Sequence, residues 1–127
     1  MKPLVKEWVI KAEKDFLVAQ REYESLPPEY DAVCFHSQQC VEKYLKALLQ
    51  DENIYFEKTH DLDVLLEKAK NILPQLMEHK KQAVKLSSFA VEIRYPGVEA
   101  TQEEAHLCLG IAEELRKVIR GHLGGEV

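Results

Sequence analysis

A row of hydrogen-bond donors lies along one side of a helical segment in the first half of the chain. The donors recur every three or four residues, the spacing at which side chains stand above one another on a helix; they are His36, Gln39, Lys43, Lys46 and Gln50. Imidazole, amide and ammonium groups in such a row can all donate to one anion. The alternative is a solvated helix face with one satisfied, partly buried histidine, and the residue types alone do not decide between them.

A second group of donors precedes the next helical segment. Lys58, Thr59 and His60 come directly before Asp61 and Leu62. The unpaired N–H groups and partial positive charge of a helix N-terminus would help these side chains to hold a phosphate. The alternative is a capping turn in which Asp61 accepts the N–H bonds and His60 packs.

Arg94 and Tyr95 form a third group, directly before Pro96. Arg94 either offsets the negative end of a helix dipole or grips a phosphate with its planar guanidinium. Tyr95 either packs against the protein or lies against a base. The three groups together give the candidate residues for binding a nucleotide or phosphate, which are His36, Gln39, Lys43, Lys46, Lys58, His60, Arg94 and Tyr95.

Composition narrows the function. A net charge of −5 and a pI near 5.6 argue against a general nucleic-acid coat but allow a local basic pocket. The chain has no glycine-rich phosphate loop, nucleophile elbow or acidic metal cluster, so we assign no catalytic residue and no cofactor. A zinc site is also not predicted, because Cys34 and His36 are two residues apart and point to different sides of a helix.

Length and cysteine content suggest one cytoplasmic domain. The 127 residues fit a single domain over 1–127 that can bury a core. The first residues lack a signal-peptide core, and no apolar run approaches the length that spans a membrane. Three cysteines, each inside a helical pattern, indicate buried free thiols in a reducing compartment.

Apolar periodicity predicts helices throughout and no strand. The expected helices cover Leu4 to Ser25, Tyr30 to about Asn53, a segment from Leu62, a segment from Pro74 to before Pro96, and a segment that Thr101 caps with Glu104. The second should bury Tyr44, Leu45 and Leu48, and the fourth should turn Leu76, Met77, Ala83, Val84, Ser87, Ala90 and Val91 inward. Short connections favour an all-α, up-and-down antiparallel bundle of four long helices with a shorter one inserted.

Several short motifs resemble those of the HEPN domain family. The family signature Gln-x-x-Glu-Lys-x-x-Lys-Ala-Leu-Leu corresponds here to Gln39, Glu42, Lys43, Lys46, Ala47, Leu48 and Leu49. Further stretches that resemble the family follow its order and extend the likeness over nearly the whole chain; they are Trp8 with Ala12-Glu13-Lys14-Asp15, Lys58-Thr59-His60-Asp61-Leu62, Arg94-Tyr95-Pro96 and Ala112-Glu113-Glu114-Leu115.

The resemblance implies a homodimeric domain that binds a nucleotide or nucleic acid and works with a separate small nucleotidyltransferase, as in toxin–antitoxin pairs. One alternative is a metal-independent ribonuclease of the toxin branch, whose signature is an Arg followed four to six residues later by a His. Arg94 departs from that signature, because no histidine follows it before His106. A structural dimer without a ligand is the third possibility.

Overall fold

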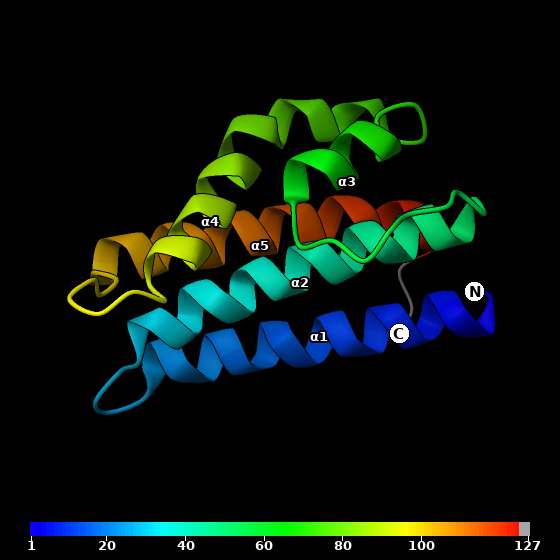
Figure 1. The fold of residues 1–127 in the computed structure, drawn as a ribbon. Helices are drawn as coiled ribbons and strands as arrows, with labels where there is room; N and C mark the ends of the chain where they lie inside the picture. The colour runs from blue at the N-terminus through cyan, green and yellow to red at the C-terminus, as the bar shows by residue number, and fades with distance from the viewer. Residues whose placement is uncertain (125–127) are drawn as a thin grey trace.

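The computed structural model describes residues 1–124, and these residues form a bundle of helices without a strand (Figure 1). The elements are α1 (Pro3–Glu24), α2 (Tyr30–Asp51), α3 (Leu62–Ala69), the 3-10 helix η1 (Pro74–His79), α4 (Lys80–Glu92) and α5 (Gln102–Leu123). The predicted all-helical fold is confirmed, with α3 as the shorter inserted helix.

Helix α2 is the centre of the bundle. It packs against α1, α3, α4 and α5, and Figure 1 shows α1 running antiparallel beside it while α3 and α4 lie on its other side. Tyr44, Leu45 and Leu48 are fully buried, as the sequence predicts. Because α2 contacts every other α-helix, a polar side chain on it can meet partners from several parts of the chain.

The helix ends follow from local sequence. Helix α1 stops at Glu24, shortly before Pro27 and Pro28, which cannot continue a helix. Thr101 and Glu104 form the predicted capping box at the start of α5. At the start of α3, the Asp61 carboxylate accepts hydrogen bonds from the backbone N–H groups of Asp63 and Val64.

One prediction about the fourth helix is wrong. Residues 74–79 form the 3-10 helix η1, and the α-helix begins only at Lys80. Leu76, Ala83 and Ala90 are buried as predicted, but Val84 and Val91 are 45% and 52% exposed, because Leu86 takes the inward position beside Ala83 and Ala90.

The cysteines behave as expected. Cys34, Cys40 and Cys108 are buried, and none forms a disulfide. Burial raises the pKa of the Cys40 thiol, so this thiol stays protonated. Of the helices in residues 1–124, none combines the length and apolar character needed to cross a lipid bilayer.

Candidate functional site

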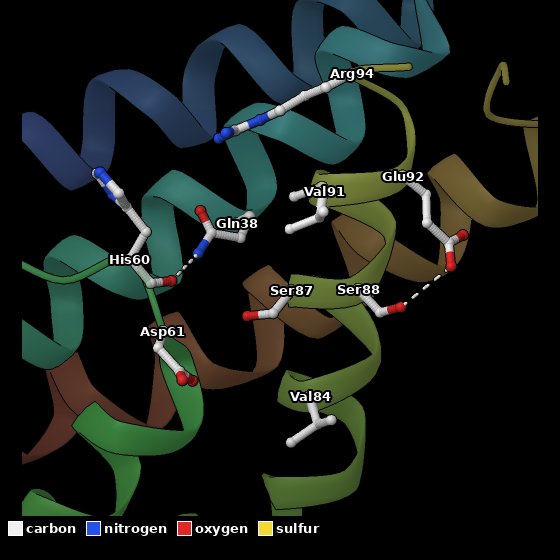
Figure 2. Close-up of a pocket in the computed structure, with 10 residues that line it drawn as sticks. Gln38, His60, Asp61, Val84, Ser87, Ser88, Val91, Glu92 and Arg94 are labelled. Atoms are coloured by element: carbon white, nitrogen blue, oxygen red, sulfur yellow. Dashed lines mark hydrogen bonds between the residues drawn. The ribbon is translucent and has the colours of Figure 1, made fainter. Parts of the chain in front are cut away.

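A groove of about 560 Å³ lies between α4, α2 and the segment that enters α3. Its lining residues are Gln38, His60, Asp61, Val84, Ser87, Ser88, Ala90, Val91, Glu92 and Arg94. In Figure 2, Val84, Ser87 and Val91 project from α4 toward the segment around His60 and Asp61. The volume falls in the range of small-molecule sites in proteins, and two of the candidate residues from the sequence line it.

Arg94 supplies the cation of this groove. Its side chain is exposed and extends over α2 on the side where His60 lies (Figure 2). Within residues 1–124, no hydrogen bond or ion pair joins its guanidinium to another side chain. All five N–H donors of Arg94 are therefore available to an anion.

His60 is held in a defined orientation by the core of the bundle. Its Nδ1 lies 2.9 Å from Oε1 of Glu42, a carboxylate with only 3% of its side chain exposed. Because a carboxylate only accepts, Nδ1 carries the proton and Nε2 is left for a ligand. Gln38 fixes the backbone as well, since its Nε2 donates to the His60 carbonyl oxygen at 2.9 Å (Figure 2).

Lys46 also belongs to the Glu42 group. Its Nζ donates to Oε2 of Glu42 at 3.0 Å and lies 5.5 Å from the centre of the Trp8 ring. With 8% of its side chain exposed, Lys46 is buried in this ion pair and does not line the groove, although the sequence analysis grouped it with the other donors of α2 as a candidate for an anion. The helical spacing is correct, but the segment before α3 and the Trp8 side of α1 cover this part of α2.

His36 and Lys43 repeat the same pattern around Asp15 of α1. The carboxylate, 11% exposed, accepts from Nδ1 of His36 at 2.8 Å and from Nζ of Lys43 at 2.6 Å. Three donors of the row on α2 thus bond to two carboxylates: His36 and Lys43 to Asp15, and Lys46 to Glu42, which also bonds to His60 from the segment before α3. This division brings His36 and Lys43 together, but it leaves them outside the residues that line the groove.

A third carboxylate joins α1 to α5. Glu13 accepts from Nε and Nη2 of Arg116 at 2.6 and 2.7 Å, and it also accepts from the Tyr44 hydroxyl. Burial acts to raise the pKa of Glu13, but the bonds from Arg116 and Tyr44 outweigh it and hold that pKa below its usual range. This ion pair contributes to the packing of the bundle, and Glu13 does not line the groove.

The remaining candidates lie apart from the groove. Gln39 donates to Oε1 of Gln38 at 3.2 Å, so it supports a groove residue. Lys58 is exposed, Tyr95 is 63% exposed, and neither lines the groove. Asp61 caps α3, so the N-terminal N–H groups proposed for a phosphate already bond to the protein's own carboxylate.

Sequence reasoning missed the partners of these donors. Asp15 contacts His36 and Lys43, and Gln38 donates to the His60 carbonyl oxygen, so each orients a group described above. Asp61 caps α3, one of the two roles that the sequence allowed for it, and it also lines the groove. One signal was available for Glu42, an acidic side chain inside a row of donors. Asp15 and Gln38 gave none, because their partners lie 21 and 22 residues away in the chain.

The fold and the groove define a helical bundle with a charged central helix, and the comparisons agree with this class. The HEPN domain model matches residues 5–122, so the chain belongs to the HEPN domain family. The chain is similar in structure to TT1696 from Thermus thermophilus, with a TM-score of 0.80, 19% identity, and coverage of 93% of this chain and 97% of that one. ST0689, an archaeal HEPN homologue, matches with a TM-score of 0.73, 26% identity, and coverage of 92% and 95%. A search of curated proteins found no match.

Proposed function

We propose that this chain binds a nucleotide or a short nucleic-acid segment in the groove, with a phosphate at Arg94. The observation that carries the proposal is the free guanidinium of Arg94, which has no side-chain partner among residues 1–124 and opens onto the groove. An arginine in this state pairs with a phosphate through two parallel hydrogen bonds.

Two further features support a nucleotide over a bare phosphate. The exposed side chains of Val84 and Val91 give the α4 wall an apolar surface of the kind that contacts a base or sugar. The ring of His60 has Nε2 free, since Nδ1 is bound to Glu42. With the proton on Nδ1, this Nε2 is a hydrogen-bond acceptor, and it can accept from a sugar hydroxyl, which a bare phosphate lacks.

Arg94→Ala should weaken nucleotide binding by about tenfold or more, because it removes a bidentate, charge-assisted contact. Isothermal titration with nucleoside monophosphates at fixed salt measures the effect. Arg21→Ala is the matched control, since Arg21 is an exposed arginine at the end of α1 that does not line the groove.

The melting temperature should stay close to that of the wild type in both variants, because neither arginine is buried. Equal affinity of the Arg94→Ala and Arg21→Ala variants would contradict the proposal. So would an affinity that falls only together with the melting temperature.

Family membership supports a wider proposal about partners. We infer that the chain acts as a cytoplasmic homodimer, as a single domain over 1–127, beside a separate small nucleotidyltransferase. Co-expression with the product of a neighbouring nucleotidyltransferase gene, followed by light scattering on the purified sample, tests both assemblies. A monomer that does not retain such a protein would contradict them.

We expect no RNA cleavage by the protein alone. Such cleavage without a metal needs a group that moves the proton of the attacking 2′-hydroxyl and a second group that stabilises the charge on phosphorus. His106 does not line the groove, because it lies beside Tyr23, whose hydroxyl is 3.3 Å from Nδ1 of His106. Of the histidines in residues 1–124, only His60 lines the groove with Arg94, and its Nδ1 is bound to Glu42.

Incubation with mixed RNA substrates, with and without a chelator, measures this. Cleavage that survives the chelator and disappears in both Arg94→Ala and His60→Ala would show that the groove is a nuclease site. Cleavage that the chelator abolishes would point to a contaminating metal-dependent nuclease.

A further inference from the structure

The groove is electrically polarised along its length. Arg94 lies at one end, and the carboxylate of Asp61 lies across the groove from Ser87 toward the other (Figure 2). Glu92 is the other carboxylate among the lining residues; it accepts from Ser88 and extends on the side of α4 away from Ser87. Ser87 lies within α4, whereas Arg94 lies in the turn that follows the end of α4 at Glu92. A ligand that spans the groove thus meets a cation at one end and an acceptor near the other.

One oxygen of the Asp61 carboxylate is not used by the protein. Oδ1 accepts both capping bonds, at 3.0 Å from Asp63 N and 3.4 Å from Val64 N. Oδ2 makes no hydrogen bond with a residue in 1–124, and Asp61 is exposed. The cap therefore fixes the orientation of the carboxylate and leaves a charged acceptor at the groove.

Ser87, which lines the groove across from Asp61, adds a second polar group without a hydrogen-bond partner. Its hydroxyl oxygen is shielded from water and has no hydrogen-bond partner among the described residues. Figure 2 shows this side chain directed from α4 toward Asp61. A change of rotamer about χ1 would turn the hydroxyl to a polar ligand atom, and such a contact would satisfy it.

We propose that the Asp61 end of the groove selects a base with an exocyclic amino group, while the phosphate lies at Arg94. This inference rests on the proposed function and names its ligand class: an aminated base such as cytosine or adenine, in preference to uracil or hypoxanthine. The amino group donates to Oδ2 of Asp61. A carbonyl oxygen in its place faces a carboxylate, which cannot donate to it and repels it.

The opposite orientation is disfavoured by the same two ends. A phosphate at the start of α3 would face the Asp61 carboxylate, and the helix N–H groups that attract anions already bond to that side chain. Repulsion between the phosphate and the Asp61 carboxylate disfavours a ligand bound in this orientation, whereas Arg94 attracts the phosphate at the other end of the groove. The charge distribution therefore sets the direction of the ligand.

The test uses two pairs of ligands that match in size: CMP with UMP, and AMP with IMP. Dissociation constants are measured by isothermal titration for the wild type, Asp61→Asn and Arg94→Ala. The wild type should bind CMP about tenfold more tightly than UMP, and AMP more tightly than IMP, because the exocyclic amino group donates to Oδ2 of Asp61, whereas the carbonyl oxygen at the same position of uracil or hypoxanthine is repelled by it.

Asp61→Asn changes the groove without changing the fold, because asparagine caps a helix about as well as aspartate. When its Oδ1 occupies the capping position, the free atom at the groove is an amide nitrogen, which donates. The CMP-to-UMP preference should then fall to about one or invert. Arg94→Ala should weaken all four ligands by a similar factor.

The outcomes separate the two proposals. Equal binding of CMP and UMP by the wild type, or an unchanged preference in Asp61→Asn, overturns the inference; the groove remains a nucleotide site if affinity still depends on Arg94. Binding that does not depend on Arg94, or no binding of any of the four ligands, overturns the proposed function and the inference with it. Ser87→Ala should not lower the melting temperature, since it removes an unpaired buried hydroxyl. Because that hydroxyl can either donate or accept, its removal should leave the CMP-to-UMP preference under the control of Asp61.

Discussion

Glu42→Ala should lower the free energy of unfolding by about 3–5 kcal/mol, the cost of removing one partner from a buried ion pair. Glu42 is 3% exposed, and its carboxylate accepts from Lys46 and His60. Its removal leaves the ammonium of Lys46 almost fully buried without an opposite charge. Urea denaturation followed by circular dichroism measures the loss, with a slope that stays close to that of the wild type.

The cost of leaving the Lys46 ammonium without its partner can be isolated in a protein that already carries the substitution Lys46→Met. In that background no ammonium is stranded, so Glu42→Leu should cost clearly less than Glu42→Ala costs in the wild type. Glu113→Ala is the control for an exposed pair, because Glu113 and Lys117 are more than half exposed and 3.8 Å apart; its expected cost is below about 1 kcal/mol. A loss from Glu42→Ala as small as that of Glu113→Ala would mean that Lys46 reaches water in solution.

The two carboxylate groups explain why a row of donors on α2 is not a ligand site by itself. His36 and Lys43 share Asp15, and His60 and Lys46 share Glu42. In each group a lysine offsets the charge of the carboxylate, and the histidine is oriented by it. The donors therefore act first within the protein, and only groups that remain unpaired, such as the Arg94 guanidinium, are free for an anion.

The helices were predictable because each depends on local signals. The apolar stripe around Leu48, the capping box at Thr101 and the capping carboxylate at Asp61 all lie within a few residues of the feature that they determine. The phase of the inward face of α4 was predicted only in part, because a stripe through Ala83, Val84 and Val91 fits helical spacing as well as the observed stripe through Ala83, Leu86 and Ala90. That phase decides that Val84 and Val91 line the groove.

The candidate site was only partly predictable for a related reason. Arg94 and His60 were identified from residue type and motif, and the structure places both in one groove. Lys46 was grouped with the other donors of α2 by its helical spacing. Spacing shows which way a side chain points from its own helix, but it does not show which other segments cover that side chain. Arg94 and Asp61 lie at opposite ends of the groove because α4 packs beside the segment before α3. A single sequence does not reveal that these two segments are neighbours.

Leu48→Ala should destabilise the protein by about 2–5 kcal/mol, the range found for leucine truncation in protein cores. Leu48 is fully buried in the middle of α2, the helix that packs against all four other α-helices. The cost has two parts: the transfer of the lost methyl groups and the cavity left between helices that cannot all move inward at once. Alanine is the best helix former, so backbone propensity does not add to the loss.

Leu17→Ala is the matched control, since Leu17 is 43% exposed on the outer face of α1. Its expected effect stays within about 0.5 kcal/mol, as for surface substitutions away from specific contacts. Urea denaturation of both variants at one temperature gives the comparison, and the difference between them reports the packing around α2. A cost below about 0.5 kcal/mol for Leu48→Ala would show that α2 is not the buried centre of the bundle, and the orientation of Glu42 and His60 would then lose its structural basis.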